Sequence, residues 1–244
     1  MKPRFRAFLI HLVGSISLGL LAVALVFLVW YPAPLHRAVG VTAIFLILMG
    51  VDVVIGPVLT LIVFNPGKKT LRFDLTVIVI LQIIAFGYGI STVAEGRPAW
   101  LVFNVDRFDL TRAYEIDDRR LNEAQPEYRT APWFGPRWVS ARTPADAEQR
   151  NTLTFEAVFA GVDLPQRPDL YQPLAAEADA LRQKAHPLDL LLRYNPPDSV
   201  KATLAKWPNA DAWLPMMAPA KPVTVLLRKD SAEVMAIVDL KPWD

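Results

Sequence analysis

The sequence contains no cysteine, only three histidines and no marked excess of charge of either sign. Without cysteine, disulfides, thiolate catalysis and cysteine-ligated metals are excluded. The 26 basic and 24 acidic residues give a formal net charge of +2, which excludes a dedicated nucleic-acid binder. Apolar residues, in contrast, make up 53% of the chain, and the mean hydropathy is +0.27. These values indicate a membrane-embedded segment joined to a water-soluble one.

The charges divide the chain into two regions. Residues 1–95 carry 7 basic and 3 acidic residues, whereas residues 96–244 carry 19 basic and 21 acidic ones. Because the net charges of the two regions have opposite signs and partly cancel, the small net charge of the whole chain hides two different environments. We therefore expect a transmembrane region over residues 1–95 and an outer domain over residues 96–244.

Three apolar runs in the first region are long enough to cross a bilayer, which needs about 20 residues. They cover residues 7–30, 38–64 and 75–94. Basic residues before the first run resemble the start of a signal peptide, but the run is too long and no small-x-small cleavage site follows. The first run is therefore predicted to be an uncleaved signal anchor.

Basic residues in the short loops predict the orientation, because they are retained on the cytoplasmic side. The amino terminus and the loop of residues 65–74 each carry three Lys or Arg, whereas the loop of residues 31–37 has only Arg37. The amino terminus is thus expected in the cytoplasm. Three spans then place the C-terminal domain outside, in the periplasm of a Gram-negative host.

Asp52 lies near the middle of the second span, where a carboxylate costs about 3 kcal/mol. One interpretation is a hydrogen-bonded anchor, with Ser17, Gln82 or backbone freed near Pro57 as the partner. The other is contact with a partner helix. Pro57 itself is expected to kink the span and free the carbonyl near Val53.

His11 lies four residues beyond the start of the first apolar run, about 6 Å below the cytoplasmic edge. Two interpretations stay open for this side chain. It is either a hydrogen-bonded imidazole near the interface or a group that recognises an acid at that shallow depth.

Motifs for catalysis are missing. His11, His36 and His186 fall in different parts of the chain, which disfavours a three-histidine zinc site. There is no HExxH, GxSxG or P-loop pattern. An intramembrane aspartyl peptidase needs two facing acids, and Asp52 is the only deep one. We therefore predict no catalytic residue, no metal and no cofactor.

The outer region is rich in proline, with 16 of the 21 prolines, and is predicted to be a loop-rich α+β domain. Strands are expected at residues 100–105, 110–116, 152–159, 223–228 and 233–240. The first two are expected to flank a turn at residues 106–108. Helices are expected at residues 174–184 and 199–207, the second with Asp198 or Ser199 as its N-cap.

Aromatic residues punctuate the polar stretch of residues 117–150, where Trp133, Phe134 and Trp138 alternate with prolines. This stretch is either an irregular connection whose aromatics pack on the domain or an exposed loop that binds protein.

Several blocks, in order and at matching spacing, resemble the type IV pilin accessory proteins of the TfpX/TfpZ type. The blocks are residues 6–11, 30–32, 50–54, 56–57, 64–69, 97–98 and 106–108. The resemblance covers about residues 4–116. It implies an inner-membrane protein that stabilises or chaperones a particular major type IV pilin before assembly into a pilus.

This resemblance brings no catalytic residue with it. Expected partners are the pilin, the lipid bilayer and the pilus assembly machinery, with no nucleic acid. Pilins of this family carry a glutamate near the start of a single apolar helix, and His11 has a suitable depth to meet it. The candidate partner-binding residues are His11, Asp52, Pro57, Arg97, Asp106, Arg107, Phe108, Trp133, Phe134 and Trp138.

The alternative is an enzyme that modifies the pilin at the membrane boundary. It predicts a polar pocket near a cluster of Glu95, Arg97, Asp106 and Arg107. The simpler interpretation of that cluster is a salt-bridged turn close to the membrane.

Overall fold

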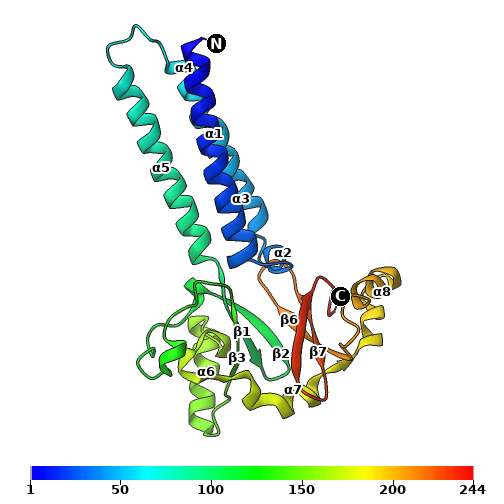
Figure 1. The fold of residues 1–244 in the computed structure, drawn as a ribbon. Coiled ribbons are helices and arrows are strands. Elements are labelled where there is room, and N and C mark those ends of the chain that lie inside the picture. Colours follow the sequence, from blue (N-terminus) through cyan, green and yellow to red (C-terminus); the bar gives the residue numbers. More distant parts are fainter. Residues whose placement is uncertain (1, 244) are drawn as a thin grey trace. The chain divides into compact units, whose positions relative to one another are not determined.

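The computed structural model describes residues 2–243 and shows the predicted architecture of three apolar helices followed by an α+β domain (Figure 1). The chain forms two compact units, which meet at Gly96 and Arg97. Residues 37–39, in the loop after the first span, belong to the second unit rather than the first. Each unit is described separately below.

The first unit consists of three spans, Pro3–Trp30, Val41–Val63 and Leu71–Glu95, each long and apolar enough to cross a membrane. Helix α1 covers Pro3–Ala24 and continues as a π-helical segment, Leu25–Trp30. The second span joins α3 (Val41–Gly50), a π-helical segment (Val51–Ile55) and α4 (Gly56–Val63); α5 covers Leu71–Glu95. The short α2 (Leu35–Val39) precedes the second span.

The wide π-helical turn ends at Ile55, two residues before Pro57. Proline lacks an N–H and clashes with the preceding turn, so the regular hydrogen-bond ladder cannot pass through it. A π-helical turn absorbs this interruption and changes which backbone groups are paired. Asp52 is the acidic residue inside this turn, and its side chain is buried in the bundle.

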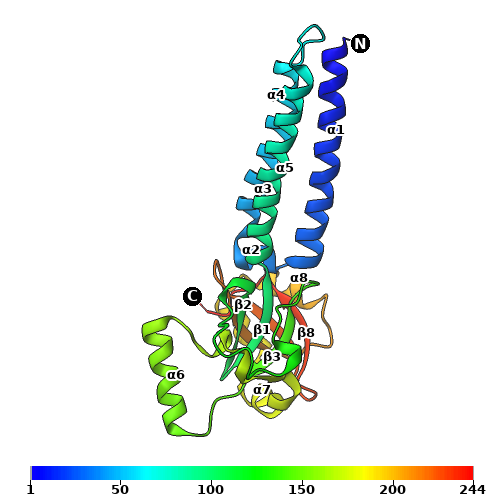
Figure 2. The ribbon, with the colours of Figure 1, turned by 90° about the vertical axis from the view of Figure 1, so that its left-hand side faces the viewer.

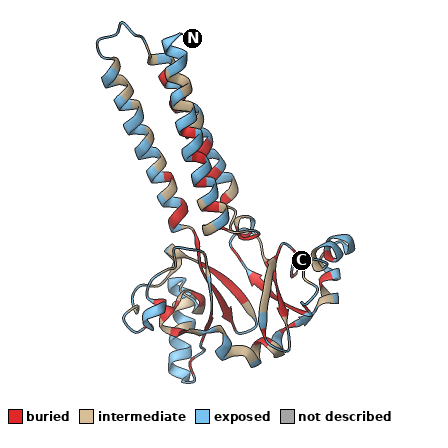
Figure 3. Ribbon diagram, viewed as in Figure 1, coloured by how far each residue is buried: buried red, intermediate tan, exposed pale blue. Residues whose placement is uncertain are grey.

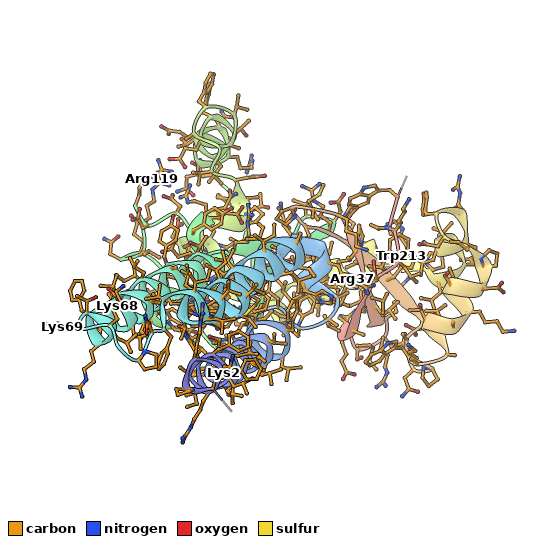
Figure 4. The ribbon with its side chains drawn as sticks, turned by 90° about the horizontal axis from the view of Figure 1, so that it is seen from above. Lys2, Arg37, Lys68, Lys69, Arg119 and Trp213 are labelled. Atoms are coloured by element: carbon orange, nitrogen blue, oxygen red, sulfur yellow. The ribbon has the colours of Figure 1, made fainter. Side chains whose placement is uncertain are left out.

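Basic side chains gather at one end of the first unit. Arg4 donates hydrogen bonds to the carbonyls of Leu61 and Ile62 at the end of α4, the second at 3.3 Å. Lys68, in the loop before α5, forms an ion pair at 2.6 Å with Asp74 in the first turn of that helix. Lys2, Lys68 and Lys69, labelled in Figure 4, are exposed. The amino terminus and the second loop therefore share the positive charge of this unit.

The second unit is built on one sheet with strand order β4-β3-β1-β2-β6-β7-β8, and β5 pairs with β6. The β1–β3 and β2–β6 pairs are parallel, and the others are antiparallel. The strands are β1 (Pro98–Asn104), β2 (Arg107–Arg112), β3 (Arg137–Ala141), β4 (Tyr171–Pro173), β5 (His186–Pro187), β6 (Ala212–Met217), β7 (Val223–Arg228) and β8 (Glu233–Val238).

The helices of the second unit are short. They are α6 (Ala147–Ala160), α7 (Ala178–Lys184) and α8 (Pro197–Leu204). Turns of 3-10 helix occur at Ala113–Glu115, Pro126–Tyr128, Leu164–Gln166, Pro168–Leu170, Leu174–Glu177 and Leu188–Arg193. Helix α6 projects from the rest of this unit, as Figure 2 shows, and none of its residues is buried.

The core of the second unit contains two clusters on different strands of the sheet, one on β1, β3 and β4 and the other on β6, β7 and β8. One cluster is centred on Trp100, whose ring meets Tyr128 and Tyr171 edge-on at centroid distances of 5.8 and 5.5 Å. The other gathers Leu191, Trp213 and neighbouring aliphatic side chains. The strands are accordingly the most continuously buried part of the unit (Figure 3).

Residues 37–39 join this unit through main-chain and side-chain contacts. The Ala38 carbonyl accepts hydrogen bonds from the amides of Ala220, at 2.9 Å, and Lys221, at 3.2 Å. Arg37, labelled in Figure 4, pairs with Asp239 at 3.3 Å. Although burial acts in the opposite direction, the neighbouring Lys221 and Arg37 hold the pKa of the Asp239 carboxyl below its usual value.

The strand predicted at residues 152–159 is wrong, because these residues form the second half of α6. The Asp146 side chain caps the helix by accepting from the Gln149 amide at 3.0 Å, and Gly161 ends it in a left-handed conformation. Leu153, Glu156 and Ala157 are half-buried on one side, which is the helical spacing of three and four residues. The alternation of apolar and polar residues over this short stretch was therefore a weaker signal than the capping residues at the two ends of the helix.

Other differences are smaller. The helix predicted at residues 199–207 begins earlier, at Pro197, and Pro196 rather than Asp198 or Ser199 occupies the N-cap position, with no side-chain cap. The predicted irregular stretch of residues 117–150 contains β3, and β6 was missed. Pro215 makes β6 hard to recognise in the sequence, because proline is rare inside strands. The structure tolerates this proline because pairing with β2 begins only at Met216.

The turn between β1 and β2 lies at Val105 and Asp106, slightly before the predicted position. Val105 has φ of 61° and is exposed, and a β-branched residue is strained in this left-handed region. We expect Val105→Gly to raise the free energy of unfolding by about 1 kcal/mol. Thermal unfolding of the full chain in detergent measures this, with Val105→Ala as the control that keeps a Cβ. A lower midpoint for the glycine variant than for wild type would contradict the assignment of strain.

Candidate functional site

A polar cluster links all three spans of the first unit. The His11 ring on α1 lies between Thr60 of α4 and Gln82 of α5: Nδ1 is 2.6 Å from Thr60 Oγ1, and Nε2 is 2.7 Å from Gln82 Oε1. The Gln82 amide nitrogen donates to Ser15 Oγ at 3.2 Å and to the Asp52 carbonyl at 2.7 Å. One glutamine thus connects α1, the π-helical turn and the third span.

The cluster fixes the roles of its donors and acceptors. Since the Gln82 nitrogen serves Ser15 and the Asp52 carbonyl, its oxygen must accept, and we assign the His11 proton to Nε2. Nδ1 then accepts from the Thr60 hydroxyl. Both nitrogens of His11 are therefore used within the bundle, as the hydrogen-bonded interpretation of this residue expected.

Asp52 is 5% exposed, and its main chain is the part that anchors Gln82. Gln82, one of the predicted partners of Asp52, therefore bonds to its main chain. Ser17, another predicted partner, instead donates to the Val13 carbonyl of its own helix at 2.8 Å. Gly56 makes the close approach possible, because a Cβ there would lie 2.1 Å from Gln82 Oε1.

A cavity of about 230 Å³ adjoins this cluster. Helix α1, the π-helical turn and α5 supply its lining: His11, Gly14, Ser15, Leu18, Asp52, Val79, Gln82, Ile83 and Phe86. Leu18, Val79 and Ile83 are exposed, so the cavity opens on the outer surface of the bundle. A Cβ added at Gly14 would meet no atom within 4 Å. We call this opening the α1/α5 groove.

The charged residues predicted to cluster at the membrane boundary do not come together. Arg97 precedes β1, whereas Asp106 and Arg107 lie at its other end, about 23 Å away by the rise of a seven-residue strand. Arg97 is buried, and it donates to the Pro132 carbonyl at 3.0 Å and the Ala131 carbonyl at 3.4 Å. The proposed pocket at this cluster is therefore not formed.

Arg107 instead interacts within its own strand. Its Nε lies 3.2 Å from Asp109 Oδ1, and Asn104 donates to Asp109 at 3.2 Å. Burial raises the pKa of the Asp109 carboxyl despite these partners. Asp106 is exposed in the turn.

The aromatic candidates have different environments. Phe108 is fully buried and packs against Phe103 and Trp138, with ring centroids 5.5 and 4.9 Å away. The Trp133 ring lies over the Arg97 guanidinium at 4.0 Å and is 53% exposed. Phe134 is 92% exposed. Within this stretch Trp138 therefore packs on the domain, whereas Trp133 and Phe134 are exposed, and protein binding by these two residues stays a prediction.

An ion-pair network that the sequence did not reveal centres on Arg167. This residue is 1% exposed, and its guanidinium lies 2.5 Å from Glu156, 2.8 Å from Asp169 and 3.7 Å from Asp117. Glu156 also meets Arg120 at 3.2 Å. Because Glu156 belongs to α6, the network ties this projecting helix to the loop segments that contain Asp117 and Arg167.

Two features of the second unit bear on possible chemistry, namely its cavities and the grouping of its acidic and histidine side chains. No group of three His, Asp or Glu residues within residues 2–243 could hold a metal ion. A cavity of about 600 Å³ lies beside α6 and is lined largely by charged side chains, among them Arg142, Arg167 and Asp169. His186 packs on the Trp213 ring at 4.9 Å.

Comparison with known proteins decides the family. The "Fimbrial assembly protein FimB" family model matches residues 1–40. A "Fimbrial assembly protein, serogroup I" from Dichelobacter nodosus is 34% identical over 202 residues, which cover 81% of this chain and 78% of the relative. The chain belongs to the fimbrial assembly protein family.

Further relatives from Dichelobacter nodosus agree. The family protein of serogroup E1 is 35% identical over 181 residues, 73% of this chain and 70% of its own length. That of serogroups C1 and C2 is 37% identical over 99 residues, 40% of this chain and 76% of its own length. The resemblance to a type IV pilus accessory family is thus confirmed. No solved structure gives a significant match.

Proposed function

We propose that this protein takes part in pilus assembly as a non-catalytic membrane factor that holds one major type IV pilin before its incorporation. Membership of the fimbrial assembly protein family supports the role in assembly. The loop charges support an inner-membrane location with a cytoplasmic amino terminus and a periplasmic second unit.

The α1/α5 groove is the observation that carries the proposed mechanism. Both helices pack chiefly on α4, and the groove between them opens outward at Leu18, Val79 and Ile83. Gly14 leaves open space where a second helix backbone could approach closely, as small residues do between membrane helices. A pilin helix seated here would convert three helices into a four-helix bundle.

Polar groups at the base of the groove suit a helix that carries a polar residue. Asp52 lines the groove, and a carboxyl group inside a span favours neighbours that donate hydrogen bonds. His11 also lines the groove, and its Nε2 is the group we assign to the pilin glutamate. This pairing requires Nε2 to exchange Gln82 for the glutamate, and His11→Ala would leave piliation unchanged if the pairing were wrong.

Filling the groove tests the mechanism. We expect Gly14→Leu to reduce co-purification of pilin at least tenfold and to abolish surface pili, because the leucine side chain occupies the helix seat. Gly87→Leu is the matched control: Gly87 is also surrounded by open space, but it lies on α5 outside the groove.

Three measurements on these strains separate the possibilities: the amount of this protein, the amount and mass of pilin, and surface pili. Normal pilin capture by Gly14→Leu at a normal protein level would refute the groove as the binding site. A change in pilin mass on deletion of the protein would instead indicate a modifying enzyme.

A further inference from the structure

The loop of residues 131–136 is held next to the point where the chain leaves the third span. Span Leu71–Glu95 ends two residues before Arg97. Arg97 is buried, and its guanidinium donates to the Pro132 and Ala131 carbonyls while the Trp133 ring covers it at 4.0 Å. One arginine therefore clamps the loop beside the end of the span.

Covalent geometry alone limits the distance between the loop and the end of the span. Consecutive Cα atoms are about 3.8 Å apart, and an extended arginine side chain adds about 7 Å. With the 4.0 Å between the guanidinium and the Trp133 ring, the ring lies within about 15 Å of Gly96, whatever the orientation of the second unit.

The end of the third span is expected in the headgroup region. Its 25 residues extend about 37 Å as a helix, and the hydrocarbon core is about 30 Å thick. The headgroup layer adds about 5–8 Å on each side. The loop is therefore held within about 15 Å of a chain position expected in that layer.

The loop presents exposed aromatic side chains. Phe134 is 92% exposed and Trp133 is 53% exposed. Gly135, with φ of 88°, makes the turn that places Phe134 at its tip, and Pro132 and Pro136 stiffen it. Exposure of these apolar ring surfaces to water is energetically unfavourable, and the stiff turn cannot bury them by folding back.

We propose that the Trp133–Phe134 loop inserts into the lipid headgroup region at the outer end of the third span. Aromatic side chains favour this layer, where the ring meets acyl chains and the polar edge meets water. The loop thus anchors the second unit to the bilayer surface in addition to the covalent connection. The observation that selects lipid over protein is the continuity with the span through Arg97.

Absence of cysteine from the sequence makes a direct test possible. The full chain with Phe134→Cys is labelled with the environment-sensitive dye NBD and reconstituted in phosphatidylcholine–phosphatidylglycerol vesicles. Because Phe134 is almost fully exposed, the substitution leaves the core intact. Phe159→Cys on α6, where the side chain is 79% exposed, is the matched control.

We expect the label at position 134 to show blue-shifted emission and at least twofold stronger quenching by lipids that carry a doxyl group near the headgroup. The label at position 159 should resemble free dye in water. Equal, water-like emission at both positions would overturn the proposal. A blue shift at position 134 that appears only when pilin is added, without quenching by doxyl lipids, would overturn it in favour of a protein contact.

Discussion

Replacing Arg167 with methionine is expected to lower the free energy of unfolding of the second unit by about 3–5 kcal/mol, the usual cost of breaking a buried ion pair. Arg167 is 1% exposed and is shared by Glu156, Asp169 and Asp117. Methionine fills a similar volume, but it leaves these acids without their common cation. Since Glu156 is the link to α6, the helix is also expected to detach from the loop segments that contain Asp117 and Arg167.

The matched control for this variant is Arg119→Met. Arg119, labelled in Figure 4, also meets Asp117 and Glu156, at 2.7 and 3.7 Å, but its side chain is 49% exposed. Water can therefore solvate the two acids in place of the Arg119 side chain, and a much smaller loss in the free energy of unfolding is expected. Denaturant titration of the full chain in detergent, followed by near-UV circular dichroism, measures both. Equal effects of the two substitutions would show that the burial of Arg167 carries no special weight.

The pH dependence of the control gives an independent readout. The hydrogen bond from Arg119 lowers the pKa of the Asp117 carboxyl below its usual value. A carboxyl with a lowered folded pKa adds stability above its unfolded pKa, near 4, and loses it as the pH falls through the folded pKa. Wild type should therefore lose stability below about pH 4, and Arg119→Met should lose less over the same range.

Substitution Gln82→Leu is expected to destabilise the three-helix bundle by about 2 kcal/mol. Gln82 joins His11, Ser15 and the Asp52 carbonyl, and a hydrogen bond between membrane helices contributes about 0.6 kcal/mol on average. Leucine is well suited to a span, so the loss reflects the hydrogen bonds. Unfolding in mixed micelles with increasing SDS, followed by helical circular dichroism, measures it.

Ser91→Ala on the same helix controls for the loss of a polar group. The Ser91 hydroxyl bonds only to the Tyr88 carbonyl of its own helix, at 2.8 Å. It should therefore leave the SDS midpoint near that of wild type. A midpoint for Gln82→Leu as high as that of Ser91→Ala would show that the polar cluster does not hold the bundle together.

The spans could be predicted because apolar runs of this length rarely occur outside membrane-spanning helices. The predicted bounds of the spans differ from the observed bounds by a few residues. The hairpin of β7 and β8 followed from alternation around residues 229–231. Helix α6 did not, since its apolar residues also alternate and none of them is buried. In such a case the capping residues Asp146 and Gly161 are the better signal.

The polar cluster could be predicted only in part. Gln82 was one of three partners expected for Asp52, and it does bond to the Asp52 main chain. The contacts of His11 with Thr60 and Gln82 depend on how three helices are shifted along one another, which no local pattern encodes. The separation of Arg97 from Asp106, in contrast, follows from the strand predicted between them at residues 100–105, and the charged cluster was inconsistent with that strand.

Residues 37–39 give the second unit an additional attachment to the membrane region. These residues lie between the first and second spans but belong to the second unit, through Ala38 and Arg37. The chain therefore passes between the two units at two separated places, around residues 37–39 and at Gly96. A body on one tether can swivel freely, whereas a body on two separated tethers resists torsion. A twisting force on the second unit would thus reach the spans through two connections of the chain rather than through one.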